Sequence, residues 1–370
     1  MRARLASSPY AGFPRGGIFN QIVSLQPKLL LQLARSSTES RLLPDFVSVS
    51  VSYDLTKIQI GAGMEIRVWQ PGDEVAILDL FGIVFGKPMA EAFWRWRYLD
   101  HPAGGPLIAL AWDGDRLAAH YAASRAPLLV DGISRPAALS MTTMTHPDYR
   151  GQGLFERSAS VLYDQMTAEG IEAVWGFPNR NSNVPFRRKL QWSAIADIPV
   201  LACDIRPGKP APQTLLGVAR IDARFDLGRP PAAGVQADHR ADILHWRIDC
   251  HPQNRYLILT LPASVGLDGY AILKPYGDAD FDLVLLAAAD DRAYPDLIAG
   301  TLAAVEARGG RRINCWSMPQ DPARIALERV GFQAVAPVTY FGARGLSAGV
   351  NLRLEDARRW RIAMVDSDIY

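Results

Sequence analysis

The sequence predicts an α/β protein made of two similar domains in tandem. Strand and helix patterns alternate along most of the chain, a Pro- and Gly-rich stretch interrupts them near the middle, and one aromatic motif occurs twice. The chain has 370 residues, of which 49% are hydrophobic, which is enough for two hydrophobic cores. Each domain is expected to contain a mixed, mostly antiparallel twisted sheet flanked by helices.

The first domain opens with a strand at residues 65–69 and a helix at residues 73–85. An aromatic helix, "AEAFWRWRYL", and the strands "PLIALAWDG", "RLAAHYAASRAPLLVDG" and "RPAALSMTTMT" follow, with Asp-Gly pairs as turns. A second long helix then carries Phe155, Ala159, Leu162 and Met166 on one face and ends at Gly170.

The second domain repeats this order, and one motif aligns between the copies. "WRYLDHP" places Trp96, Arg97 and His101 at the spacing of Trp246, Arg247 and His251 in "WRIDCHP". The second copy lacks the glycine loop described below. Residues shared by both copies are therefore assigned to core packing, whereas Trp94 and Tyr98 remain candidates for a pocket.

The boundaries follow from composition. Residues 1–63, basic and Ser-rich, are predicted to be a poorly ordered N-terminal extension, with a targeting peptide as the alternative. Residues 64–205 form the first domain, 206–231 a Pro/Gly-rich linker, 232–345 the degenerate second domain and 346–370 a C-terminal tail. The tail either docks on the first domain or frays.

Composition excludes several classes of function. A formal net charge of +2 is too small to give the strong positive field that would favour a nucleic-acid partner. No apolar run is long enough to span a bilayer. Three distant cysteines and six histidines without ligand spacing indicate no disulfide frame and no metal site. A cytoplasmic location is expected, and the oligomeric state stays open.

A short segment, "THPDYRGQGLF", carries the most specific signal. It lies between a predicted strand and a predicted helix, so Gly151 and Gly153 would leave unpaired amides at the helix N-terminus. Such amides, the helix dipole and Arg150 suit a phosphate or pyrophosphate. The segment has neither the Lys-Ser/Thr ending of a P-loop nor the setting of a dinucleotide fold.

With these residues the sequence resembles the GCN5-related N-acetyltransferase (GNAT) superfamily over about residues 64–202, and more faintly in the second copy. The family's loop pattern, Q/R-x-x-G-x-G/A, is matched by Arg150 to Phe155, except that Phe155 replaces a small residue and is expected to pack against something bulky. The resemblance implies that acetyl-CoA or another acyl-CoA binds here. The implied coenzyme-binding residues are Met144, Thr145, Arg150, Gly151, Gln152, Gly153, Leu154, Phe155, Asn181 and Arg187.

The resemblance also implies that the strand Met141–Thr145 offers an amide to the thioester carbonyl. Asn179 and Asn181 match an asparagine that the family often places near the coenzyme arm, and the alternative for both is an Asx turn or helix cap. Arg187 stands where many relatives carry a tyrosine that protonates the departing thiolate. Because arginine cannot donate a proton near neutral pH, the acid must come from elsewhere or be water.

The candidate bases are Tyr121, His120 and, through a folded-back tail, Tyr370, with the carboxylates of Asp366 and Asp368 as further options. The hydroxyls of Ser140 and Thr142 lie on a strand expected to line the acceptor cleft. The competing explanation for His120 is a structural or surface histidine. Cys203 lies beyond the expected site, so no covalent intermediate is supported.

These features predict an N-acetyltransferase, an acyltransferase of the class that moves groups other than aminoacyl. It would transfer an acyl group directly in a ternary complex to a small-molecule amine, with an amino sugar favoured by the aromatic residues. Two alternatives stay open: a long-chain acyl or aminoacyl transferase of lipid or cell-wall assembly, and a non-catalytic CoA-binding scaffold. Asp290 and Asp291 of the second copy would repel a pyrophosphate, so only the first domain is expected to bind acyl-CoA.

Overall fold

A computed structural model describes residues 57–60, 63–206, 215–227, 234–347 and 353–370, and residues from Asp54 onward form one compact unit. The predicted N-terminal extension lies outside the described residues except for strand β1 (Lys57–Ile60) and Gly63. β1 is the edge strand of the main sheet and pairs with β2 (Met64–Val68) in antiparallel register.

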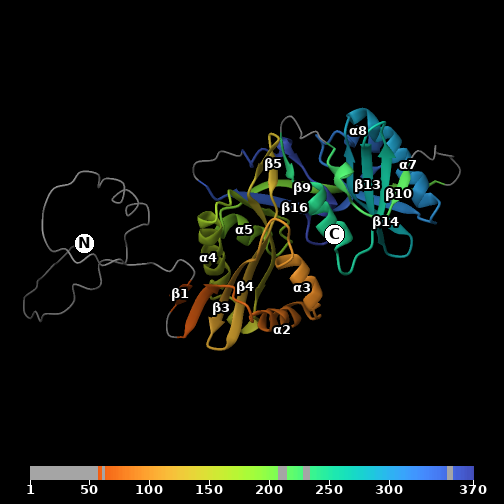
Figure 1. Cartoon of the computed structure of the whole chain (residues 1–370). Helices are drawn as coiled ribbons and strands as arrows, with labels where there is room; N and C mark the ends of the chain where they lie inside the picture. The colour runs from red at the N-terminus through yellow and green to blue at the C-terminus, as the bar shows by residue number, and fades with distance from the viewer. Residues whose placement is uncertain (1–56, 61–62, 207–214, 228–233, 348–352) are drawn as a thin grey trace, which may run out of the picture. The chain divides into compact units, whose positions relative to one another are not determined.

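The first half builds a mixed sheet with helices on both faces (Figure 1). Buried residues of α2 (Glu74–Phe85) and α3 (Glu91–Tyr98) share one core with the sheet, whereas α4 (Leu154–Ala168) packs into a second core on the opposite face. The α4 stripe is apolar at a helical period, so this face is buried. The strands are β3 (Leu107–Asp113), β4 (Arg116–Arg125), β7 (Ala137–Thr145) and β8 (Ala173–Gly176), and only β7 and β8 pair in parallel.

The second half repeats this plan. Its strands are β12 (Leu257–Pro262), β13 (Leu267–Tyr276), β14 (Asp280–Ala288) and β15 (Arg312–Trp316), and β14 and β15 are the parallel pair. Its helical elements are α6 (Ala241–Leu244), η3 (His245–Asp249), η4 (Asp291–Ala293), α7 (Tyr294–Glu306) and α8 (Arg324–Arg329). The predicted linker contributes an edge strand, β10 (Leu216–Val218), and a short helix, η2 (Ala223–Phe225).

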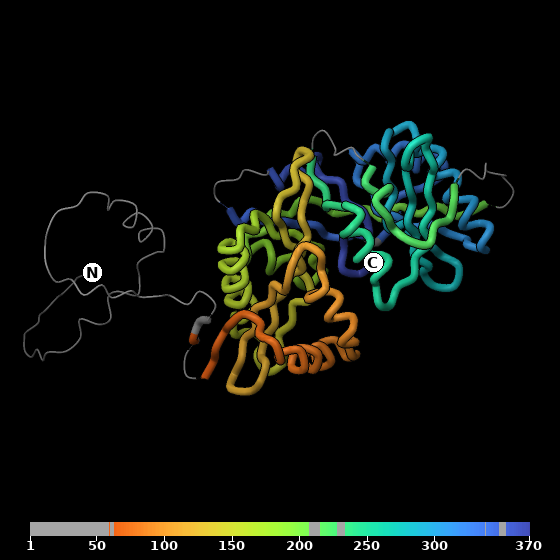
Figure 2. Tube along the Cα trace, in the orientation of Figure 1, coloured from red at the N-terminus to blue at the C-terminus, as the bar shows by residue number. Residues whose placement is uncertain are grey.

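The two halves share one sheet because they exchange their long final strands. β16 (Gln333–Gly345) lies between β8 and β9 (Ser193–Asp204), and β9 in turn lies between β16 and β15. Each long strand therefore pairs with the last parallel strand of the other half. Figure 2 shows the blue C-terminal chain running beside the yellow-green segments of the first half.

The duplicated aromatic motifs meet in the core between the halves. The indole rings of Trp96 and Trp246 stack with centroids 4.7 Å apart, and each Nε1–H donates to the other's backbone carbonyl at 3.0 Å. His101 packs against Trp246 and His251 against Trp96. These reciprocal contacts relate the two copies by an approximate two-fold axis, which explains why both copies keep the same residues.

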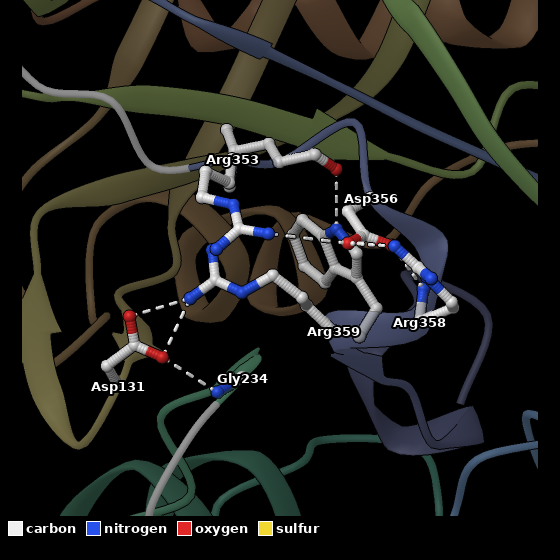
Figure 3. A network of polar contacts seen from close by, with 8 residues as sticks. Asp131, Gly234, Arg353, Asp356, Arg358 and Arg359 are labelled. Carbon is white, nitrogen blue, oxygen red and sulfur yellow. Dashed lines mark hydrogen bonds and ion pairs between the residues drawn. The ribbon is translucent and has the colours of Figure 1, made fainter.

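A small second sheet ties the first half to later segments of the chain. It consists of β17 (Trp360–Arg361), β11 (Val235–Ala237), β5 (Leu128–Val130) and β6 (Ile133–Arg135) in that order. At its turn the Asp131 carboxylate accepts from the Gly234 amide and the Arg359 guanidinium, which lower the pKa of Asp131 (Figure 3). The remaining short elements are η1 (Pro147–Tyr149), α5 (Asn183–Lys189), η5 (Ala357–Arg359) and η6 (Met364–Asp366).

The predicted fold class, mixed and mostly antiparallel sheets flanked by helices, is confirmed. The continuity of the two sheets through β9 and β16 has no counterpart in the sequence prediction. In the described part of the chain, no helix is long and apolar enough to cross a membrane, and no group of three or more ligating side chains is placed to hold a metal ion.

The stacked tryptophans generate a stability prediction. Trp96→Phe removes the donor to the buried Trp246 carbonyl and should lower the free energy of unfolding by about 2 kcal/mol. Urea denaturation measures the free energy of unfolding. The control Val265→Ala, at a side chain that is 90% exposed, should change this free energy by less than about 0.5 kcal/mol. Equal effects of the two substitutions would show that the indole bond does not hold the halves together.

Candidate active site

The parallel strands β7 and β8 diverge and open a cleft. They pair only where Ala137–Leu139 faces Ala173–Trp175, and β7 then continues to Thr145 without β8 beside it. The opening holds a cavity of about 540 Å³, a size that suits a small-molecule ligand. Its walls come from β7 (Ser140, Met141, Thr142, Thr143), from the segment after β8 (Phe177, Pro178, Asn179, Ser182, Phe186, Trp192), from α2 to α3 (Phe81, Phe85, Lys87, Met89, Phe93, Arg97, Tyr98) and from the tail (Asp368, Ile369).

A bulge in β7 forms part of this wall. Thr142 and Thr143 lie opposite the single residue Tyr121 of β4, and Thr142 has a φ of 49°. A β-branched residue is strained in this left-handed region, so the surrounding contacts must hold it there. One such contact is the imidazole of His120, whose Nδ1 lies 2.8 Å from the Thr142 carbonyl oxygen. The bulge takes main-chain groups of β7 out of the sheet's regular pairing at the cleft.

His120 is buried behind the bulge and is not among the residues that line the cleft. Because a carbonyl only accepts, Nδ1 must carry the proton and Nε2 the lone pair. Within the described residues, this buried Nε2 has no hydrogen-bond partner. Burial lowers the pKa of His120 to about 4, so the ring is neutral at pH 7 and supports the bulge.

Tyr121 is fully buried, and its hydroxyl contacts two others. Its Oη lies 2.7 Å from Tyr163 Oη and 3.1 Å from Ser140 Oγ. Burial raises the pKa of Tyr121 well above its ordinary value of 10, so the hydroxyl stays protonated at neutral pH. Of these groups, Ser140 reaches the cleft wall.

The glycine corner lies where β7 passes through η1 into α4. Gly151 and Gly153 have φ values of 79° and 72°, and a Cβ added at either would meet no atom within 4 Å. Gly153 is the N-cap of α4 and offers no side-chain cap. Within the described residues, the amides from Gly151 to Glu156 have no hydrogen-bond partner, so they are available to an anion.

The other predicted coenzyme residues near this corner differ in exposure. Arg150 and Gln152 are exposed, Thr145 is half-buried, and Met144 and Leu154 are buried in the cores. Phe155 packs against Phe186 and Tyr121 with centroids 5.3 and 5.8 Å away, which is the bulky neighbour expected from the sequence. The buried side chains limit Met144 and Leu154 to main-chain contacts with a ligand.

Three residues beyond β8 that the sequence singled out differ in whether they line the cleft. Asn179 forms an Asx turn, since its Oδ1 accepts from the amides of Asn181 at 2.9 Å and Ser182 at 3.0 Å. Asn179 lines the cleft, whereas Asn181 is exposed and is not among the lining residues. Arg187 is also exposed and lines a different cavity, together with Arg188 and Glu355.

The C-terminal tail docks at the cleft. The Asp368 carbonyl accepts from Arg97 Nη2 at 3.1 Å, and Asp368 and Ile369 contribute to the cleft wall. Tyr370 is directed elsewhere, because its ring packs against Trp316 and lies 4.8 Å from Lys274 Nζ. Asp366 is bonded to His239 at 2.6 Å and does not line the cleft.

Sequence reasoning missed the contribution of α2. The rings of Phe81 and Phe85, one helical turn apart, pack at a tilt with centroids 4.5 Å apart, and both line the cleft. The sequence signal was two phenylalanines four residues apart at the end of the predicted helix, and the structure leaves Phe85 47% exposed. Of the two aromatic residues left open, Trp94 is fully buried in the core and Tyr98 lines the cleft.

Comparisons with known proteins identify a matching domain family and solved structures with a similar fold. Residues 65–195 match the family model described as acetyltransferase (GNAT) domain, and no curated protein matches the chain. A GCN5-related N-acetyltransferase from Anabaena variabilis superposes with a TM-score of 0.62 at 11% identity, covering 77% of this chain and 73% of that one. One from Kribbella flavida has a TM-score of 0.61 at 16% identity, with 80% and 72% covered.

The N-myristoyltransferase of Saccharomyces cerevisiae, solved with bound myristoyl-CoA, has a TM-score of 0.56 at 11% identity and covers 85% of this chain and 88% of that one. The parting parallel strands, the bulge and the glycine corner before a helix all lie within the segment that matches an acetyltransferase domain. Residues 65–195 thus match a GNAT domain, and the chain shares the fold of these acyltransferases.

The buried histidine generates a prediction about pH. The pKa of His120 is about 4 in the folded protein and about 6.5 when unfolded, so between these values the unfolded state binds more protons and stability falls as the pH drops. His120→Asn, which keeps a donor for the Thr142 carbonyl, should remove about 3 kcal/mol of this dependence between pH 7 and pH 4. Urea denaturation across this range measures it, and an unchanged slope would contradict a neutral buried ring.

Proposed function

We propose that the chain transfers an acetyl or other small acyl group from acyl-CoA to a primary amine held in the cleft. The amine attacks the thioester directly in a ternary complex. The strongest support is that two features occur together in one continuous segment. β7 and β8 diverge, and the glycine corner follows directly at the end of β7. In this reading the coenzyme's diphosphate binds the free amides from Gly151 to Glu156 and its arm follows β7 into the cleft.

The bulge provides the donor for the reacting carbonyl. An amide of the Thr142–Thr143 segment, taken out of regular strand pairing, donates to the thioester oxygen as negative charge develops on it. The His120 imidazole fixes the segment by binding the Thr142 carbonyl. A donor held in place before the reaction stabilises the tetrahedral intermediate without reorganising.

Neither His120 nor Tyr121 is suited to remove a proton from the amine. The lone pair of His120 belongs to a weak base, and Tyr121 does not ionise near neutral pH. Asp368 is the one carboxylate among the lining residues, next to the cations Lys87 and Arg97. We propose that the Asp368 carboxylate attracts and orients a protonated amine. The amine then releases its proton to water before it attacks the thioester.

A covalent intermediate on cysteine is not part of this proposal. Burial raises the pKa of both Cys203 and Cys315, which disfavours the reactive thiolate. Both side chains pack in the core of the second half, and none of the chain's three cysteines lines the cleft. Direct attack therefore accounts better for the groups that surround the cavity.

The second half is assigned no coenzyme. The corner before its helix α7 is capped by Asp290, whose carboxylate accepts from the Arg292 amide at 2.9 Å. The Asp290 carboxylate already accepts one of the amide hydrogens at this corner, and its negative charge would repel a diphosphate. We propose that this half braces the first through the exchanged strands and delivers the tail to the cleft.

A longer acyl donor is the second candidate. Phe81, Phe85, Met89 and Phe93 give the cleft an apolar wall, which suits an acyl chain as well as the face of an amino sugar. Turnover with acyl-CoA donors of two to fourteen carbons distinguishes the two candidate functions. The rate is measured by the release of the CoA thiol. A preference for long chains would favour the second candidate, and coenzyme binding without turnover on an amine panel would favour a scaffold.

The coenzyme corner is tested by Gly153→Leu. The side chain covers the amides, so the Kd for acetyl-CoA should rise about tenfold or more, the loss expected for one or two hydrogen bonds to a charged group. The matched control is Gly309→Leu, because Gly309 has a φ of 75° and similarly open surroundings at the end of α7. Isothermal titration calorimetry measures both. Equal Kd values in both variants and the unmodified protein would refute the assignment.

The acceptor side is tested by Asp368→Asn. Loss of the carboxylate should raise KM for a cationic amine about tenfold and leave the Kd for acetyl-CoA unchanged, because the charge faces the acceptor. Asp278→Asn, at an exposed turn of the second half, is the control. Steady-state kinetics with the best amine of the panel measures both, and an unchanged KM would remove Asp368 from the acceptor site.

A further inference from the structure

Three titratable side chains meet on the surface of the second half. The His245 ring lies between the other two, with Nδ1 2.8 Å from Asp249 Oδ2 and Nε2 3.4 Å from Cys250 Sγ. Cys250 is exposed, and the side chains of His245 and Asp249 are 49% and 11% exposed. None of the three lines the cleft beside β7, so the cluster is separate from the proposed acyl-transfer site.

The backbone at the end of η3 brings the histidine and the cysteine together. The Cys250 amide donates to the His245 carbonyl at 3.1 Å, which closes a π-type turn and places both residues on one face of it. Asp249 is fixed from outside the turn, because its Oδ2 also accepts from the Ile221 amide at 2.9 Å. The carboxylate is therefore anchored independently of the imidazole that it orients.

The first copy of the motif has the same turn without these side chains. Its Asp100 amide donates to the Arg95 carbonyl at 3.0 Å. Counted from the shared tryptophan, Arg95, Leu99 and Asp100 occupy the positions of the histidine, the aspartate and the cysteine. Packing between the halves explains the residues that both copies keep. It does not explain the three that are reactive in the second copy alone.

The hydrogen bonds determine where the protons lie. A carboxylate only accepts, so His245 Nδ1 carries a hydrogen and donates it to Asp249. In the neutral ring Nε2 then holds the lone pair, and it faces the Cys250 thiol. Transfer of the thiol proton to Nε2 gives a thiolate beside an imidazolium, whose charge Asp249 stabilises. A nucleophile, its base and an orienting group are thus arranged in series, which activates a cysteine.

The surroundings of the thiol favour attack on sulfur over attack on a carbonyl carbon. The Cys250 amide could otherwise stabilise a tetrahedral oxyanion, but it is already bonded to the His245 carbonyl. Attack on a disulfide forms no oxyanion and needs only an accessible thiolate and an acceptor for its proton. The exposed sulfur and the adjacent imidazole meet both conditions.

We propose that Cys250 exchanges with low-molecular-weight disulfides, with His245 as its base and Asp249 as a positioning residue. The thiol proton passes to His245 Nε2, and the Cys250 sulfur bonds to one sulfur of the disulfide. The sulfur–sulfur bond breaks with its electron pair on the departing sulfur, which takes the proton from the imidazolium and leaves as a thiol. The product is a mixed disulfide on Cys250, and the disulfide is the one co-reactant consumed.

The test follows the reaction of the native full chain with the aromatic disulfide dithiobis-nitrobenzoate at pH 7. One thiol should react rapidly, because Cys203 and Cys315 are buried, and Cys250→Ser should abolish this phase. His245→Gln should slow it about tenfold, because an isolated thiol is only ~3% ionised at pH 7 and the lower nucleophilicity of a more acidic thiol offsets part of the difference. Asp249→Asn should slow it about threefold, the loss of one half-exposed ion pair, and steepen its pH dependence.

The matched control is Ser264→Cys in the Cys250→Ser background, which places a thiol at an exposed bend of the same half. Its rate should be about tenfold lower at pH 7 and should rise about tenfold per unit between pH 6 and pH 8, as for an isolated thiol. The unmodified protein should change by less than about threefold per unit. Oxidised glutathione should add one glutathionyl group at Cys250, measured by mass spectrometry, and thermal denaturation checks that each variant is folded.

Three outcomes would overturn the assignment. A Ser264→Cys control that reacts as fast as the unmodified protein would leave Cys250 an ordinary exposed thiol. An unchanged rate and pH profile in His245→Gln would remove the base, and an unchanged profile in Asp249→Asn would remove the positioning role. A rapid phase that persists in Cys250→Ser would assign the reactivity to another cysteine. Each result leaves the proposed acyl transfer untouched, because the two sites share no residue.

Discussion

The pairing of β9 with β16 is the constraint on which the rest of the structure depends. These strands form the centre of the sheet, and each one completes the sheet of the other half. The main-chain bonds of a central strand are buried and have no other partners, so neither half can close its sheet alone. The stacked Trp96 and Trp246 fix the same relation between the halves through side chains.

The cleft follows from this arrangement. β16 pairs with β8 on the side away from β7, so β8 is held in the sheet although it pairs with β7 over only three residues. β7 is held on its other side by β4, and the bulge at Thr142 directs its end away. The opening is therefore maintained by the sheet itself, which explains how a polar, strained segment can persist beside a cavity.

Much of the first half could be predicted from local sequence. The stripe of Ala159, Leu162 and Met166 identified α4, and Gly151 with Gly153 identified the corner before it, because helix periodicity and backbone freedom are local properties. The repeat of Trp96 and Trp246 indicated a structural role, and the two residues are in direct contact.

The exchange of β9 and β16 could not be predicted, because either strand can satisfy the same edge and only the assembled fold selects between them. The contact between two buried tyrosine hydroxyls was also beyond the sequence. Tyr121 and Tyr163 are 42 residues apart, and their contact depends on how α4 lies across β4. Arg187 aligned with a catalytic position but lines another cavity, because the packing of the short helix α5 sets the direction of its side chains and the sequence pattern does not show it.

The two duplicated arginines, Arg97 and Arg247, bind the chain's last residues through the main chain of the tail and not through its side chains. Arg97 donates to the carbonyl of Asp368, and Arg247 donates to the carbonyl of Ser367. Both contacts are to main-chain oxygen, which every residue type supplies. Substitutions at positions 368 and 369 can thus alter the chemistry presented at the cavity while the anchoring guanidinium contacts persist, so substrate preference is able to diverge without loss of attachment.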